Sequence, residues 1–193
     1  MKKISFLFLC VFLIFGCKDS DSKKSAAAVA ALDSEDPYLK MFTEFMMIDG
    51  KSVFRGVNFD MTEDEVKKIE HSYETSRENS SEKMQELFFE VDLSEELLDF
   101  ADIRYSFDEK GLFFINVESY LTSPEKSKSF YKNLESYFNS AYGKGEYADD
   151  GFLEFETTKN GKKIQAAIKE VNIAPTEKDK GSYGFYLLYS LPK

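Results

Sequence analysis

Carboxylates are the most abundant side chains in this sequence that could support chemistry. The chain has 193 residues with 35 Asp and Glu, and two close pairs stand out, Glu154 with Glu156 and Asp149 with Asp150. Either pair could act as a general acid and base, or bind a hard cation through oxygen ligands. A strongly acidic protein contains such pairs by chance, so a solvated strand face or turn is the simpler interpretation of both.

Other catalytic groups are scarce. The single histidine, His71, lies on a charged segment near Tyr73, and no serine or cysteine nucleophile has an evident base partner. Residues 143–146 lack the spacing of a phosphate-binding loop, and no calcium-loop spacing occurs. The sequence therefore favours a non-enzymatic protein, and it predicts no metal site and no cofactor.

Tyrosines form a second group of candidate residues. Exposed tyrosines can stack on sugars or anchor a protein partner, although packing in the core or sheet is their more frequent use. Six tyrosines lie on the predicted long helix and the C-terminal strands: Tyr137, Tyr142, Tyr147, Tyr183, Tyr186 and Tyr189. The candidate binding residues among them are Tyr137, Tyr142, Tyr147 and Tyr186.

The first residues of the chain indicate where these groups would act. Lys2 and Lys3 precede an apolar stretch over residues 4–15, and Gly16 and Cys17 follow it. A basic start, about a dozen apolar residues and a small residue at the cleavage site are typical of a signal peptide. The stretch is too short to serve as a stable transmembrane anchor. Residues 1–16 are therefore predicted to be removed.

Residues 13–17 read Leu-Ile-Phe-Gly-Cys and resemble the lipobox of bacterial lipoproteins, although Phe15 replaces the small residue found in most lipoboxes. The resemblance implies that Cys17 becomes the first residue of the mature protein and carries the lipid, palmitate included. An ordinary signal peptide with an incidental cysteine is the alternative. In enteric lipoproteins, Asp after the lipidated cysteine retains the protein in the inner membrane. Lys18 occupies that place here and favours the outer membrane.

The charge of the chain excludes some partners. The net charge is −10 at pH 7, and the loss of Lys2 and Lys3 with the signal peptide makes the mature chain more acidic. Such a surface repels phosphate backbones and anionic head groups, so we expect no nucleic-acid partner and membrane attachment through the N-terminal lipid. Of two cysteines, Cys10 leaves with the signal peptide and Cys17 carries the lipid, which leaves no disulfide and no thiolate metal site.

The segment after the lipidated cysteine lacks aromatic residues, so residues 17–35 are predicted to form a flexible tether. A single domain is predicted over residues 36–193. Its first helix should begin at Asp36-Pro37 and end at Asp49-Gly50, because proline suits the first helical position and glycine stops a helix.

A second helix is predicted from Thr62 to Tyr73. Thr62 and Glu65 have the spacing of a capping box, in which each side chain bonds the other residue's backbone amide. Residues 75–85 are polar and are predicted to form a loop or a frayed helix end. Residues 94–98 suit a short helical turn.

The stretch over residues 55–66 resembles the opening of small envelope lipoproteins of the BamE-like and β-lactamase-inhibitor-like group, which often read Gly-Met-Ser/Thr-x-x-x-Val. Met61, Thr62 and Val66 match this pattern, whereas Asp60 replaces the glycine. The match covers about a dozen of the 193 residues. It implies a fold of this kind and transfers no functional residue.

The remaining elements follow from alternation and turn residues. The long helix should begin at Ser123-Pro124 and end before Gly143, and the stretch over residues 172–184 should form an exposed loop. Residues 183–191 carry apolar side chains at both odd and even positions, and therefore on both faces of the strand, which is typical of an inner strand. Strands are predicted at residues 87–91, at 103–107 and 112–117 around a turn at 108–111, and at 153–157 and 164–168 around Asn160-Gly161.

This order of elements predicts an α+β fold with helices packed on an antiparallel sheet, and a loose repeat into halves 36–121 and 122–193. We expect a lipid-anchored, non-enzymatic binding or assembly module of the cell envelope that engages an envelope protein or peptide. The alternative is a carboxylate-based hydrolase acting on envelope glycans. It would need two acids about 5–10 Å apart in a cleft.

Overall fold

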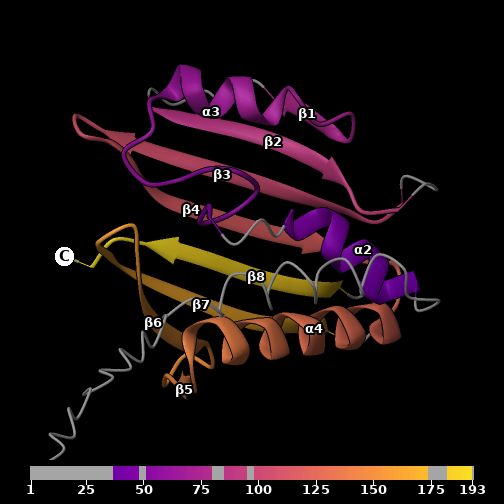
Figure 1. Cartoon of the computed structure of the whole chain (residues 1–193). Coiled ribbons are helices and arrows are strands. Elements are labelled where there is room, and N and C mark those ends of the chain that lie inside the picture. The colour runs from indigo at the N-terminus through magenta and orange to yellow at the C-terminus, as the bar shows by residue number, and fades with distance from the viewer. Residues whose placement is uncertain (1–36, 48–50, 80–84, 95–97, 174–181, 193) are drawn as a thin grey trace, which may run out of the picture.

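A computed structural model of the chain describes residues 37–47, 51–79, 85–94, 98–173 and 182–192 (Figure 1). This part of the chain contains three helices and one antiparallel sheet of eight strands, the expected combination of helices with antiparallel strands. The predicted signal peptide, Cys17 and the tether lie outside the described residues.

The eight strands form a single sheet in the order β1-β2-β3-β4-β8-β7-β6-β5, so three strands lie on each side of the central β4 and β8 pair. Both predicted hairpins are confirmed, and β8 is an inner strand as its apolar pattern indicated. The strands are β1 (Ser76–Asn79), β2 (Glu86–Asp92), β3 (Phe100–Asp108), β4 (Gly111–Tyr120), β5 (Glu146–Tyr147), β6 (Leu153–Lys159), β7 (Lys162–Ile173) and β8 (Ser182–Ser190).

The described helices are α2 (Pro37–Met46), α3 (Glu63–Glu70) and α4 (Pro124–Tyr142). The predicted caps at Thr62 and Ser123 are confirmed. Ser123 caps α4 by accepting a hydrogen bond from the Lys126 amide at 3.2 Å, and Thr62 and Glu65 form the capping box of α3. The predicted end of α3 is wrong, because the helix stops at Glu70 and not at Tyr73. The Tyr73 hydroxyl donates instead to the Arg55 carbonyl at 2.9 Å.

Two other predictions about elements are corrected, and one strand was not predicted. The predicted loop over residues 75–85 contains β1, which pairs with β2 through Ser76 opposite Val91. This polar sequence forms a strand because its backbone is hydrogen-bonded to β2. The Arg77 guanidinium adds hydrogen bonds to the carboxylates of Glu90 and Asp92. The predicted loop over residues 172–184 is shorter, since β7 runs to Ile173 and β8 begins at Ser182. The two-residue strand β5 was not predicted.

Helix α4 contacts the sheet through stacked aromatic rings. The Phe130 ring lies 4.6 Å from the Phe185 ring of β8, and the Phe138 ring lies 5.2 Å from the Phe155 ring of β6. Phe45 of α2 reaches the same Phe185 ring at 6.1 Å. In Figure 1, α2 and α4 lie on the viewer's side of the sheet. The aromatic core therefore lies between these helices and one face of the sheet.

Replacing Thr62 by Ala should lower the free energy of unfolding by roughly 0.5–2 kcal/mol. The Thr62 hydroxyl accepts from the Glu65 amide at 3.4 Å, and the Glu65 carboxylate accepts from the Thr62 amide at 2.8 Å, so the change removes one of two caps on the first turn of α3. Urea denaturation of both proteins measures the difference. An unchanged midpoint would argue against a contribution of the capping box to stability.

A buried carboxylate, Asp99, joins the start of β3 to the start of α4. It accepts hydrogen bonds from the Thr122 amide at 2.7 Å and from the Lys126 ammonium at 2.5 Å. Burial by itself raises the pKa of Asp99, but the hydrogen bonds from Lys126 and Thr122 outweigh it and hold that pKa below its ordinary value of 3.8. The ionised form of Asp99 is therefore the one that stabilises the fold.

This lowered pKa predicts a pH-dependent loss of stability on the acid side. The contribution of Asp99 to the free energy of unfolding is fully present above the pKa that Asp99 has in the unfolded chain. It is lost as the pH falls through the lower pKa that Asp99 has in the folded protein. Asp99→Asn should therefore destabilise the protein by about 1.5–3 kcal/mol at pH 7 and by less at pH 3. Urea denaturation at both pH values tests this. A difference of the same size at both, or a similar effect of the exposed control Asp149→Asn, would contradict it.

Candidate binding face

The two faces of the sheet differ in composition. On β2, Leu87, Phe89 and Val91 are buried toward the helices, and the same alternation continues along the other long strands. The residues between them form the opposite face, which we call the open face. It includes Phe88, Glu90, Phe100, Asp102, Arg104, Phe114, Asn116, Glu118, Tyr120, Glu154, Glu156, Gln165, Ala167, Lys169, Tyr186, Leu188 and Ser190.

Three carboxylates lie side by side at the centre of one row across the open face. Glu90 of β2 is opposite Asp102 of β3, which is opposite Glu118 of β4. Directly opposed residues of neighbouring strands have Cβ atoms about 4.5–5.5 Å apart, so these like charges repel. Burial, followed by the charges of Glu90 and Glu118, raises the pKa of Asp102, although Arg104 opposes this. The centre of the open face is therefore negatively charged.

The ends of this row carry hydrogen-bonded partners. Arg77 donates to Glu90 at 2.6 Å on the β1 side, and the Tyr186 hydroxyl donates to Glu118 at 3.0 Å on the β8 side. Lys169 follows Tyr186 in the row and donates to the Asp150 carbonyl at 2.8 Å. The row thus changes from acidic on β2, β3 and β4 to tyrosine and lysine on β8 and β7.

Aromatic rings flank the acidic centre on both sides. The Phe100 and Tyr120 rings stack at 4.8 Å, and Tyr120 remains 37% exposed. Burial and the charge of Glu118 raise the pKa of Tyr120 to about 12. On the other side, the guanidinium of Arg104 lies 4.7 Å from the centre of the Phe88 ring. The open face therefore combines aromatic and charged groups, as binding surfaces of proteins do.

A hollow of about 510 Å³ lies on the open face over β4, β8, β7 and β6, next to β5. Phe114, Ala167 and Leu188 contribute half-buried side chains to it. Glu146, Glu154, Glu156 and Gln165 line it with exposed side chains. The Gln165 amide donates to Glu156 at 3.2 Å. The hollow thus has apolar groups at its base and carboxylates around them.

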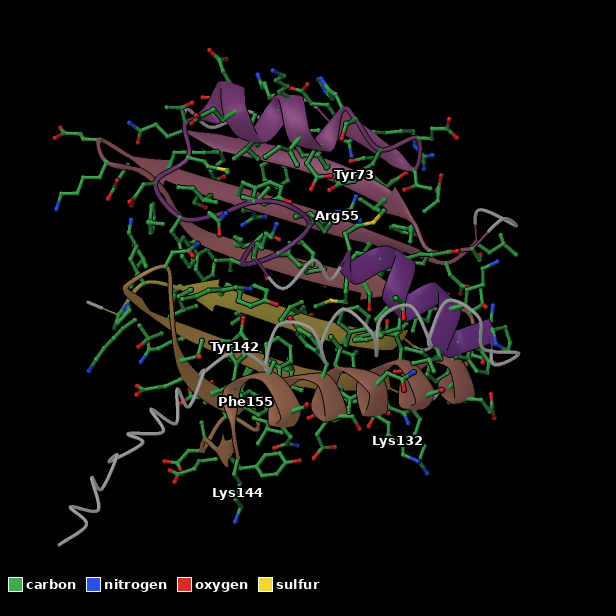
Figure 2. All side chains as sticks on the ribbon, viewed as in Figure 1. Arg55, Tyr73, Lys132, Tyr142, Lys144 and Phe155 are labelled. Atoms are coloured by element: carbon green, nitrogen blue, oxygen red, sulfur yellow. The ribbon has the colours of Figure 1, made fainter. Side chains whose placement is uncertain are left out.

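The structure places the four candidate tyrosines on two sides of the sheet. Tyr137 packs against Phe42 and Phe138, and Tyr142, labelled in Figure 2, packs against Phe138, so both belong to the helix side. Burial raises the pKa of Tyr142. Tyr147 is 69% exposed and pairs with Leu153, which points toward the helices. Tyr186 lies on the open face.

The two candidate carboxylate pairs have different surroundings. Glu154 and Glu156 are exposed on one strand and line the hollow. Asp149 and Asp150 lie in the turn before β6, where the Asp150 carboxylate accepts from the Phe152 amide at 3.2 Å. In the part of the chain that the structure describes, no group of three or more His, Cys, Asp or Glu side chains is arranged to hold a metal ion. His71 contacts Glu78 at 2.9 Å on the surface.

Sequence reasoning missed a buried polar cluster on the helix side. The Arg55 guanidinium forms two hydrogen bonds with the Glu70 carboxylate, both at 3.1 Å, and its centre lies 4.6 Å from the Tyr73 ring (Figure 2). The hydroxyls of Tyr105 and Ser76 also donate to Glu70. Burial and the charge of Glu70 raise the pKa of Tyr105. The polar contacts described here link Arg55 to Phe45, Glu70 and Tyr73 and link Glu70 to Ser76 and Tyr105, so the cluster joins elements of the fold.

No family model, curated protein or solved structure matches this chain. Among the helices that the structure describes, none is long and apolar enough to cross a membrane.

Proposed function

We propose that this protein is a lipid-anchored, non-enzymatic binding module of the cell envelope, and that the open face binds its partner. The observation that carries the proposal is the mixture of half-exposed aromatic rings and charged groups on the open face, in particular the stacked Phe100 and Tyr120. Aromatic residues that keep part of their surface exposed are typical anchors of protein interfaces. The partner would be an envelope protein or peptide.

The proposed attachment follows from the N-terminal sequence. Cys17 carries the lipid, residues 17–35 act as the tether, and Lys18 assigns the protein to the outer membrane in preference to the inner membrane. A tether of this length lets the domain present either face of its sheet to a partner. The strongly acidic chain, with a net charge of −10, disfavours nucleic acid as that partner.

The halves 36–121 and 122–193 are proposed to be related repeats. Each contributes a helix followed by four antiparallel strands, α3 with β1 to β4 and α4 with β5 to β8. The last strands of the two halves, β4 and β8, pair with each other at the centre of the sheet. Such an arrangement would join two half-sheets into one broad binding surface.

A second candidate function is a carboxylate-based hydrolase of envelope glycans. Glu154 and Glu156 favour it, because they line the hollow and residues two apart on one strand are separated by about 7 Å. That separation falls within the range used by glycosidases. Glycan release from cell-wall material by the purified protein, lost in Glu154→Gln, would support this function over the binding module.

Photocrosslinking in membranes tests the binding face. A photoreactive phenylalanine analogue at Tyr120, on the open face, should capture a discrete partner band. The same analogue at the exposed Lys132 on α4 serves as the matched control and should not capture that band. Equal capture at both positions, or no capture at Tyr120, would contradict the proposal.

Replacing Cys17 by Ser should abolish lipid attachment, because a hydroxyl does not replace the thiol that the lipobox presents for acylation. Cells expressing either form are labelled with radioactive palmitate, and the protein is recovered by immunoprecipitation. The wild-type protein should be labelled and the variant should not. Label that survives the substitution would refute the assignment of the anchor.

A further inference from the structure

We infer that the open face recognises a basic segment of a partner polypeptide, and that the hollow accommodates one of its lysine or arginine side chains. The inference rests on the proposed function, since it names the chemistry of the partner that the open face binds.

The lining of the hollow matches the two parts of a basic side chain. Lysine and arginine have an apolar stem that ends in a cation, and they bury the stem while the charge stays near water. The half-buried groups of the hollow offer apolar surface to the stem, and the exposed carboxylates around them attract the cation. The apolar groups are Phe114, Ala167 and Leu188, and the carboxylates are Glu146, Glu154 and Glu156.

The carboxylates of the hollow are arranged so that a cation would relieve their repulsion. Glu146 of β5 lies directly opposite Glu154 of β6, a cross-strand pair of like charges, which is destabilising. Glu156 follows on the same face of β6. Lys144 also lines the hollow, but in Figure 2 its side chain points away from the sheet. Among the residues that the structure describes, no lysine or arginine forms an ion pair with Glu146, Glu154 or Glu156. The place of the incoming cation is therefore not taken by another described residue.

The acidic centre of the open face extends the attraction beyond the hollow. Glu90, Asp102 and Glu118 lie on β2, β3 and β4, and β4 also contributes Phe114 to the hollow. Neighbouring strands are about 4.8 Å apart, so a segment lying across the strands could reach both places within a few residues. A segment with two or more basic residues therefore fits the charge pattern better than a single cation does.

The experiment compares two charge-matched double variants of the full mature protein in detergent. Glu154→Gln with Glu156→Gln removes two carboxylates from the hollow. Asp64→Asn with Glu125→Gln removes two exposed carboxylates from α3 and α4 on the other side of the sheet. The probe is a fluorescent octalysine peptide, and anisotropy titrations give its Kd for each protein.

The hollow variant should bind the peptide about tenfold more weakly than wild type, as the loss of two exposed ion pairs implies. The helix-side variant should bind within about twofold of wild type, since its carboxylates are far from the hollow and partly screened by salt. This contrast supports the inference. Equal weakening in both variants indicates attraction by overall charge and overturns it, as does the absence of binding to wild type.

Two further results would distinguish a polypeptide ligand from a free polyamine, and failure of this inference from failure of the proposed function. Spermine that binds as tightly as the peptide, with the same dependence on Glu154 and Glu156, would overturn the assignment of a polypeptide in favour of a free polyamine. A partner crosslinked at Tyr120 whose capture is unaffected by the hollow variant would overturn the inference and leave the proposed function standing.

Discussion

Replacing Glu70 by Gln is expected to lower the free energy of unfolding by about 3–5 kcal/mol, the largest effect of any single substitution considered. The side chains of Arg55 and Glu70 are both 0% exposed, and their charged groups meet at 3.1 Å. Without the carboxylate, the guanidinium remains buried with no opposite charge beside it. Arg55 also donates to the Phe45 carbonyl at 2.8 Å, so the end of α2 should loosen as well.

A double-mutant cycle separates the loss of the ion pair from the loss of packing. Arg55→Met with Glu70→Leu removes both charges together and should be less destabilising than Glu70→Gln alone, because no unpaired charge remains in the core. Urea denaturation of Arg55→Met, Glu70→Leu, the double variant and wild type gives the coupling energy. A double variant no more stable than the single ones would show that the geometry of the hydrogen bonds matters more than the pairing of charges.

The exposed pair of Lys40 and Glu44 serves as the control for this cycle. Its charged groups are 3.8 Å apart and both side chains are more than half exposed. Pairs of this kind contribute about 0.3–0.5 kcal/mol at most, because water screens them and both side chains lose freedom. The same cycle on this pair should therefore give a coupling energy near zero.

Replacing Gly184 by Ala should cost roughly 3 kcal/mol, because a Cβ atom has no room there. A Cβ at Gly184 would lie 2.1 Å from the Ser119 carbonyl oxygen, a backbone atom of the neighbouring strand β4. The Ser127 hydroxyl of α4 donates to the Gly184 carbonyl at 2.8 Å and accepts from its amide at 3.0 Å. The methyl group would therefore push β8 away from β4 and strain the hydrogen bonds between Gly184 and Ser127.

Gly143→Ala is the matched control for this substitution. Gly143 has a φ of +94°, but nothing lies within 4 Å of a Cβ built there. Its replacement should cost about 1–2 kcal/mol through backbone strain alone, because its φ and a ψ of −174° lie in a region that is essentially restricted to glycine. Guanidinium denaturation of both variants measures the difference. Equal losses of stability would mean that backbone strain, and not the contact with β4, decides the cost at Gly184.

Features that depend on neighbouring residues could be predicted from the sequence. The capping box of Thr62 and Glu65, the Ser123 cap and the turn at Asn160-Gly161 each involve groups within four positions, and all three occur as predicted. The inner position of β8 was readable because both of its faces carry apolar residues. Local hydrogen bonds and alternation are fixed by the chain itself, so no knowledge of distant segments is required.

Other features depended on which distant segments meet. β1 has no hydrophobic pattern and becomes a strand only because β2 offers a partner. Arg55 and Glu70 are 15 residues apart, and neither position by itself indicates a buried ion pair. Burial of charges is decided by the surrounding elements, since the same two residues on an exposed surface would be ordinary.

For the candidate binding face too, some features follow from the sequence and others only from the tertiary structure. The sequence by itself determined the acidic character of the domain, the predicted lipid anchor at Cys17 and the availability of Glu154 and Glu156. Only the tertiary structure decided that Glu90, Asp102 and Glu118 form one row, and that Tyr186 faces away from Tyr137 and Tyr142. The physical reason is strand register: a shift by one residue moves every side chain of a strand to the other face, and the contacts across the whole sheet set that register.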